Sequence, residues 1–365
     1  MTSSKIWHLE SLRGIAAIAV CLYHFQINSH FSNQFIQNAW IFVDFFFVLS
    51  GFVIAINYQN KLLNFKNIYR FQFNRFLRLY PLHISMLIIF LGIEIAKYLA
   101  EVNFGLIANN IAFSINNLSS FLSNIFLLQN FTHNIPTWNK PSWSISAEFF
   151  TYFIFALVIF ITKSQRKKII TVSILISIIS AIYLFNQGMN SSNGVVRCLL
   201  SFFLGVLTYN IFFKLNKKIT LTSSFLSFSI IALTGFILIR IENELDKNAL
   251  FILLFFAFTV ASLALTSKEC WIVRLLSNKF FVMLGTLSYG IYMIHSFVWW
   301  VFMQILRIGF NFPTQLDNNG NNIVIVENIF IGDAFMLIGL GAIILLSFLS
   351  YKFIEMPANK VKYNL

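Results

Sequence analysis

The sequence predicts an all-α fold, a polytopic membrane bundle of about ten transmembrane helices with both termini in the cytoplasm. Three observations predict it. Of the 365 residues, 58% are hydrophobic and only 11% are charged, whereas about a quarter of the residues of a soluble domain are charged. At about 20 residues per span, this apolar content suffices for about ten helices. The basic residues, which give a net charge of +13, gather on one side of the predicted bundle.

The apolar runs that are long enough to cross a bilayer define the spans. They are 11–27, 41–58, 79–100, 144–161, 169–185, 195–213, 221–240, 249–266, 281–306 and 330–354. Arg13 interrupts the first run and no small-residue cleavage pattern follows it, so we interpret this run as a retained span. The longest connection, 101–141, is rich in Asn and Ser and is interpreted as a re-entrant or interfacial segment. The chain, 1–365, is therefore expected to form one membrane-embedded domain without a fused soluble domain.

The distribution of Lys and Arg orients the bundle. When the connections are assigned alternately to two sides, 20 of the 26 basic residues fall on the side that carries both termini. The other side keeps Lys97, Lys140, Arg197, Arg240, Lys247 and Arg307. Because cytoplasmic loops are enriched in Lys and Arg, both termini are predicted to be cytoplasmic. The same segregation explains the positive charge, so no nucleic-acid partner is expected.

The cysteines indicate no metal or redox chemistry. Cys21, Cys198 and Cys270 are far apart and form no CxxC pair, so neither a disulfide framework nor a metal site is predicted.

Charged groups inside the spans are the first candidates for function, because each costs at least about 2.5 kcal/mol on insertion scales. Arg13 and His24 stand 11 residues apart on the first span, which is about 20° past three full turns, so both lie on one helical face. Their separation along the axis is roughly 16 Å. Arg13 is thus expected near the cytoplasmic leaflet and His24 in the outer half.

An outer polar cluster is expected around His24. Asp44, Glu148 and Arg197 each lie a few residues into a span from outside, and His295 reaches a similar depth from inside. An imidazole beside carboxylates suits general acid or base catalysis. Two other interpretations stay open: the carboxylates neutralise Arg197, or the histidines belong to a hydrogen-bonded packing network.

An inner basic cluster is expected around Arg13. Arg75 and Arg78 stand three residues apart just before the third span, a spacing that puts them on one helical face. Guanidinium groups bind phosphate oxygens in bidentate fashion, so the cluster suits a phosphate-rich ligand. The alternative is that these arginines only anchor the helix at the cytoplasmic face.

Six segments carry these residues in order along the chain. They read LESLRGIAAIAVCLYHF, VDFFFVLSGFVIA, RFLRLYP, PSWSISAEFF, LGTLSYGIYMIHS and YKFIEMP. Together, over 8–357, they resemble the motifs of the acyltransferase-3 family of integral membrane O-acyltransferases. The resemblance implies transfer of an acyl group, most often acetyl, from cytoplasmic acyl-CoA to a hydroxyl. The acceptor it implies is a carbohydrate, either a surface polysaccharide such as capsule or lipopolysaccharide or a lipid-linked glycan precursor.

This resemblance assigns expected roles and a location. The expected catalytic residues, with His24 as general base oriented by a carboxylate, are His24, Glu148 and Asp44. The expected contacts to the phosphates of acyl-CoA are Arg13, Arg75 and Arg78. The expected contacts to the acceptor are Trp143, Ser146, Arg197, Tyr292 and His295. The protein is expected to be a multi-pass protein of the bacterial cytoplasmic (inner) membrane, with acyl-CoA, the glycan and membrane lipid as partners and no metal.

Rival functions stay open. A membrane transporter or flippase of a glycan or an acyl carrier would also line a path with intramembrane charges, but it predicts inverted repeats that we do not find in the sequence. A structural or assembly subunit would use the polar residues for helix packing alone. Direct transfer and a covalent acyl-enzyme on Ser or Tyr are both compatible with the sequence.

Overall fold

The computed structural model describes residues 6–106, 110–213, 224–241, 246–316 and 322–361. These residues form an all-helical fold apart from one short two-stranded ribbon, as predicted. The long helices are α1 (Trp7–Tyr23), α3 (Phe42–Tyr58), α4 (Phe65–Phe104), α7 (Trp143–Ile161), α8 (Arg166–Gln187), α9 (Gly194–Thr208), α10 (Ser224–Ile239), α11 (Ala249–Leu265), α13 (Lys279–Gln304) and α14 (Ile329–Ser350). The short ones are α2 (Gln34–Gln37), α5 (Leu118–Ile125), α6 (Gln129–Thr132), α12 (Trp271–Leu276) and α15 (Met356–Lys360).

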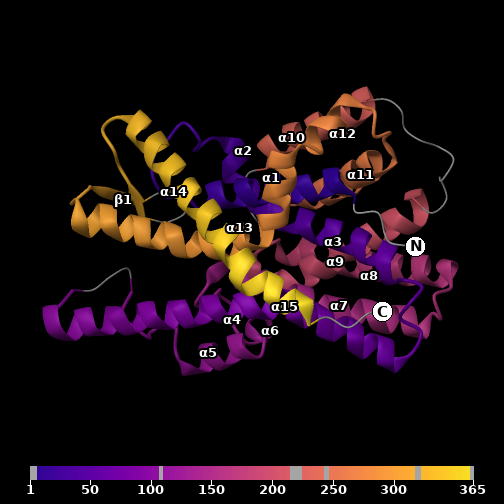
Figure 1. Ribbon diagram of the computed structural model, residues 1–365, viewed down its shortest axis with the longest axis horizontal. Helices are drawn as coiled ribbons and strands as arrows, with labels where there is room; N and C mark the ends of the chain where they lie inside the picture. Colours follow the sequence, from indigo (N-terminus) through magenta and orange to yellow (C-terminus); the bar gives the residue numbers. More distant parts are fainter. Residues whose placement is uncertain (1–5, 107–109, 214–223, 242–245, 317–321, 362–365) are drawn as a thin grey trace.

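Tighter and wider helical turns and one ribbon complete the fold. The 3-10 turns are Ala39–Ile41, Lys140–Ser142 and Ser191–Asn193, and the π turns are Tyr209–Phe213, Ile305–Gly309 and Tyr351–Glu355. Strands β1 (Thr314–Leu316) and β2 (Asn322–Val324) pair in antiparallel fashion. In Figure 1, α14 crosses α13 and leads into α15, which lies against α4.

The described part of the chain has the helices of a multi-pass membrane protein. Each predicted apolar run coincides with one of the long helices, although 221–223, at the start of the seventh run, lie outside the described residues. Among the described residues, seven helical segments are long and apolar enough to cross a membrane: Ala39–Tyr58, Phe65–Phe104, Lys140–Ile161, Arg166–Gln187, Ser191–Phe212, Lys279–Gly309 and Ile329–Lys360. Helices α1, α10 and α11 are shorter than these. The basic segment 214–218 and Lys5, which contributed to the predicted orientation, also lie outside the described residues.

Helix α4 is longer than the predicted third span. It starts at Asn64, whose Oδ1 accepts a hydrogen bond from the backbone N–H of Asn67 at 2.9 Å, and it ends at Gly105, which adopts a left-handed φ of 66°. Its 40 residues extend about 60 Å, about twice the hydrocarbon thickness of a bilayer. The basic stretch 65–78, predicted to be a connection, is therefore the first part of one continuous helix.

The segment 101–141 packs back onto the bundle through hydrogen bonds. Asn116 Nδ2 donates to Glu94 Oε1 at 2.8 Å, and Asn139 Nδ2 donates to the carbonyl oxygen of Met293 at 2.9 Å. Helix α5 contacts α4, and α6 contacts α7. Both bonds are made by the Asn side chains that distinguish this stretch, so its polar composition serves to join it to α4 and α13.

Glycines bring α1 and α13 into close contact. A Cβ on Gly285 of α13 would overlap the carbonyl group of Glu10 on α1, and one on Gly14 would overlap the backbone at Gly285. Small residues allow this approach between membrane helices. Because α1 lies directly against α13, His24 and His295 face each other.

Candidate active site

A cavity of about 140 Å³ contains His24 in its wall. Five helices, α1, α3, α7, α9 and α13, and three connections contribute to it. Its lining residues are Val20, Tyr23, His24, Trp40, Val43, Pro136, Lys140, Pro141, Trp143, Ser191, Arg197 and Tyr292. Aromatic rings and basic groups therefore line the same space, which we call the histidine cavity.

His24 meets His295 at this cavity. His24 follows the last turn of α1, and its ring stacks on that of His295 with centroids 5.1 Å apart and planes inclined by 24°. His295 is fully buried, and its Nδ1 lies 3.2 Å from the carbonyl oxygen of Ile291. Since a carbonyl only accepts, Nδ1 carries the hydrogen and Nε2 is the acceptor. That Nε2 has no hydrogen-bond partner among the described residues.

Asp44 and Arg197 form a buried ion pair beside the histidine cavity. Arg197 Nη2 lies 2.5 Å from Asp44 Oδ2, and Ser201 Oγ donates to Asp44 Oδ1 at 3.2 Å. The guanidinium lies between two indole rings, 5.2 Å from the centroid of Trp40 and 5.0 Å from that of Trp143. The described contacts of the Asp44 carboxylate therefore go to α9 rather than to His24, which is the pairing that the sequence left open.

A second, smaller cavity of about 40 Å³ lies next to the first. Its lining residues are Arg13, Val43, Phe46, Phe47, Ser144, Ile145, Glu148, Ser288, Tyr289 and Tyr292. We call it the arginine cavity. Val43 and Tyr292 line both cavities. These two side chains therefore stand between the two spaces, and we call their position the junction of the cavities.

Glu148 lies in the arginine cavity and not in the wall of the histidine cavity. Its Oε1 accepts a hydrogen bond from Ser50 Oγ at 2.7 Å and another from the Tyr152 hydroxyl. The described hydrogen bonds of Glu148 therefore go to α3 and to its own helix rather than to His24. The turn before α7 is tied to α13, because Tyr292 donates to the carbonyl oxygen of Pro141.

Arg75 is held against aromatic rings, one of which belongs to Tyr152, the partner of Glu148. Its Nη2 donates to the Tyr58 hydroxyl at 3.1 Å. Its guanidinium lies 5.2 Å from the ring centroid of Tyr58, 5.7 Å from that of Phe71 and 5.9 Å from that of Tyr152. Arg75 Nε is buried without a hydrogen-bond partner among the described residues, so a donor remains available there.

Arg13 and Arg78 approach the same region from α1 and α4. Arg13 Nη1 lies 3.9 Å from Glu10 Oε1. Arg78 interacts electrostatically with Glu10, Glu148 and Glu355. Arg13 and Arg78 thus both lie near Glu10, whereas Arg75 contacts Tyr152, which donates to Glu148.

Of the three remaining predicted acceptor contacts, two line a cavity and one does not. Trp143 lines the histidine cavity and Tyr292 lines both cavities. Ser146 is fully buried, and its Oγ donates to the carbonyl oxygen of Leu127 at 2.5 Å. Ser146 therefore joins α7 to the preceding loop and lines neither cavity.

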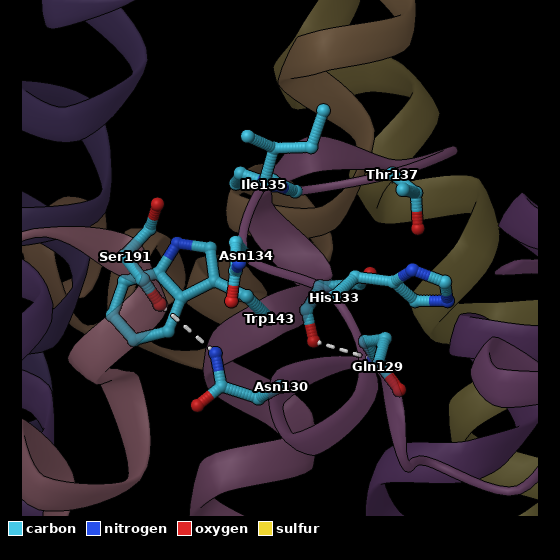
Figure 2. Close-up of a pocket in the computed structure, with 10 residues that line it drawn as sticks. Gln129, Asn130, His133, Asn134, Ile135, Thr137, Trp143 and Ser191 are labelled. Carbon is cyan, nitrogen blue, oxygen red and sulfur yellow. Dashed lines mark hydrogen bonds between the residues drawn. The ribbon is translucent and has the colours of Figure 1, made fainter. Parts of the chain in front are cut away.

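A polar niche adjoins the histidine cavity on the side of α6 and the loop 133–137 (Figure 2). It shares Pro136, Trp143 and Ser191 with the histidine cavity. Asn130 Nδ2 donates to the backbone oxygen of Ser191 at 2.9 Å, and this bond closes one side of the niche. Its volume of about 10 Å³ holds about one water molecule.

Three residues of the site had no assigned role in the sequence. Lys140 lines the histidine cavity, and Ser50 and Tyr152 bind Glu148. Tyr152 stands one helical turn after Glu148, so the i, i+4 spacing was a usable signal. Among the described residues, no group of His, Cys, Asp and Glu could hold a metal ion.

Comparisons with known proteins bear on this arrangement. A family model described as "Acyltransferase domain" matches residues 6–353. The protein named "Acyltransferase MdmB" of Streptomyces mycarofaciens is 31% identical over 159 residues, which cover 41% of this chain and 38% of the relative. The protein named "Putative O-acetyltransferase SACOL0978" of Staphylococcus aureus strain COL is 24% identical over 377 residues, which cover 96% of this chain and 57% of the relative. The chain thus spans about half the length of the curated relatives it matches, and no solved structure matches it.

Proposed function

Because the chain belongs to the acyltransferase-3 family, we propose that it is a membrane O-acyltransferase that moves an acetyl group from cytoplasmic acetyl-CoA to a carbohydrate hydroxyl. The proposed acceptor is a surface polysaccharide or a lipid-linked glycan precursor. The family supports acyl transfer. The Staphylococcus relative, which matches 96% of this chain, is named a putative O-acetyltransferase, and this name supports oxygen as the acceptor atom and acetyl as the transferred group.

The observation that carries the proposal is that Val43 and Tyr292 line both cavities and stand between them. The histidine cavity, at about 140 Å³, is the larger, and we assign it to the sugar. The arginine cavity, at about 40 Å³, is the smaller, and we assign it to the acetyl group.

The proposed topology orients this pair of cavities. We propose ten spans in the bacterial cytoplasmic membrane, with both termini in the cytoplasm. The support is the excess of Lys and Arg on the side of the termini. In this orientation Arg75 and Arg78 lie toward the cytoplasm, from which acyl-CoA comes, and His24 lies toward the outer face.

The proposed reaction is a direct transfer. The phosphates of CoA bind Arg75, Arg78 and Arg13, and the thioester carbonyl reaches the junction of the cavities. His24 removes the proton of the acceptor hydroxyl while the hydroxyl oxygen attacks the carbonyl carbon. The carbon–sulfur bond then breaks, the CoA thiolate takes the proton from His24, and the acetyl ester remains on the sugar. Asp44 and Glu148 act as positioning residues, at Arg197 and at the inner arginines respectively.

The test is acetyl transfer by the purified full chain in lipid nanodiscs. With radiolabelled acetyl-CoA and surface glycan from the producing cells, His24→Ala should lower the transfer rate by about 10²–10⁴-fold, the range for a general base. The matched control is His30→Gln, because His30 is 54% exposed and contacts Asp333 outside the site. Transfer by His24→Ala at the rate of the control would remove His24 from the mechanism.

A further inference from the structure

The histidine cavity has an unbalanced positive charge. Its lining contains His24, Lys140 and Arg197 and no Asp or Glu. Arg197 is neutralised by Asp44, which accepts two hydrogen bonds from its guanidinium. Lys140 makes no hydrogen bond or ion pair with any other residue in the described part of the chain. One exposed ammonium group, without a counter-charge among the described residues, thus stands at the edge of the cavity that contains His24.

From this imbalance we propose that the acceptor is an acidic saccharide, and that its anionic substituent binds Lys140 while its reacting hydroxyl faces His24. The inference rests on the proposed function and specifies the substrate class of the same site. The chemistry required is a carboxylate or a phosphate on the sugar, since either forms a charge-assisted hydrogen bond with an ammonium group.

The position of Lys140 is fixed by the backbone on either side of it. Asn139 Nδ2 donates to the carbonyl oxygen of Met293 at 2.9 Å. The carbonyl oxygen of Pro141 accepts hydrogen bonds from Tyr292 and Ser144, both at 3.0 Å. The lysine therefore stands on a rigid turn between α7 and α13, and only its flexible side chain needs to adjust to a ligand.

The rest of the lining suits a sugar ring. Trp40, Trp143, Tyr23 and Tyr292 supply aromatic faces and edges, against which the C–H faces of a pyranose can pack. The indoles of Trp40 and Trp143 are already held on either side of the Arg197 guanidinium. The aromatic surface is therefore preorganised before the acceptor binds, which lowers the entropy cost of binding.

The sequence supports a specific role for these charges. Only six Lys and Arg residues were assigned to the side opposite the termini, and two of them, Lys140 and Arg197, line this one cavity. Lys97 in the same set is paired with Glu94 at 3.0 Å. The phosphates of CoA are the competing anion, but the arginine cavity and α4 already provide Arg13, Arg75 and Arg78 for them.

The test is a binding measurement without an acyl donor. Trp40 and Trp143 line the cavity, so intrinsic fluorescence of the full chain in nanodiscs should report occupancy. The ligands are methyl glucuronide, glucose 6-phosphate and neutral methyl glucoside. We expect at least one charged sugar to bind about tenfold more tightly than the neutral one, because only the charged sugar forms a charge-assisted hydrogen bond with the ammonium group. The tighter of the two charged ligands identifies carboxylate or phosphate as the substituent.

Variants of Lys140 test whether this residue causes the preference for the charged sugar. Lys140→Gln should abolish the preference for the charged sugar and leave binding of the neutral sugar unchanged, whereas Lys140→Arg should retain the preference. Lys247→Gln is the matched control, because Lys247 lines a different groove and lies 4.2 Å from the ring centroid of Phe185. Equal affinity for charged and neutral sugars, no binding of either charged sugar, or a preference that survives in Lys140→Gln would overturn the proposal. So would a loss of acetyl-CoA affinity in Lys140→Gln, which would assign the lysine to the donor.

The proposed acidic acceptor and the proposed acetyl transfer can be refuted independently of each other. The binding assay contains no acetyl-CoA, so the preference for charge can be found or refuted whether or not the chain transfers acyl groups. Failure of the proposed function would appear instead as absence of acetyl transfer in the nanodisc assay with cell-surface glycan.

Discussion

The polar residues of the site differ in burial and in hydrogen-bond partners. His24 stands at the end of α1, half-buried and stacked on His295. Asp44 is fully buried and bound to Arg197. The imidazole is therefore the group placed to meet a ligand, while the carboxylate keeps a buried guanidinium neutral.

The Asp44–Arg197 pair leads to a stability prediction. Asp44→Ala leaves the Arg197 charge buried between indole rings without its partner, and breaking a buried pair in this way costs about 3–5 kcal/mol. We expect Asp44→Ala to lower the midpoint temperature of thermal unfolding in detergent markedly, as measured by fluorescence. Asp333→Ala, which breaks the exposed contact with His30, should change it little. Equal stability of the two variants would contradict the structural role of the pair.

At the scale of elements, the glycine contact between α1 and α13 sets the distance between the two histidines. Gly285→Ala should destabilise the protein by about 1–3 kcal/mol, because its methyl group overlaps the backbone of Glu10 and overpacking costs that amount. Gly92→Ala on α4 is the control. No atom lies within 4 Å of a Cβ at Gly92, so the helix propensity of Ala should stabilise that variant by about 0.5–1 kcal/mol.

Both glycine variants can be measured in one unfolding series. The two variants should change the free energy of unfolding in opposite directions, which distinguishes a close helix contact from a general effect of removing glycine. If Gly285→Ala were as stable as Gly92→Ala, α1 and α13 would not pack as described, and the stacking of His24 on His295 would lose its structural basis.

Sequence reasoning predicted the elements well where apolar periodicity is strong and poorly where polar segments enter the bundle. The long helices coincide with the predicted apolar runs, because a backbone in lipid must satisfy its hydrogen bonds within the helix. The helical stretch 65–78 was missed because its basic residues mark it as a connection in a hydropathy pattern. The hydrogen bonds of Glu148 to Ser50 and Tyr152 were not predicted, because the length of a span does not indicate which neighbouring side chains it contacts.

The site itself was predicted in part. The 11-residue spacing of Arg13 and His24 indicated one helical face, and in the structure each lines one of two cavities that share Val43 and Tyr292 in their walls. The convergence of Lys140 on the histidine cavity depends on a hydrogen bond between Tyr292 and the Pro141 carbonyl. A tertiary contact of this kind leaves no periodic signal in one sequence.

At the scale of the whole molecule, the proposed topology predicts which residues reagents can reach. In a Cys270→Ser background, Asn134→Cys in the loop before α7 should react with a membrane-impermeant maleimide in intact spheroplasts. Gln165→Cys in the turn between α7 and α8 should react only after permeabilisation. Reversed accessibility of these two exposed positions would place the termini outside and refute the proposed direction of acetyl transfer.

The central claim is that the histidine and arginine cavities form one reaction path through the junction at Val43 and Tyr292. The most direct measurement is the rate of acetyl transfer by Val43→Phe, with the affinities for acetyl-CoA and for the acceptor determined on the same preparation. The control is Val102→Phe, at a position 64% exposed on α4. The larger ring should fill the junction, so we predict that transfer falls by at least about 10²-fold, as expected when reacting groups are held apart, while both affinities stay within about twofold. Transfer at the rate of the control would contradict the shared path.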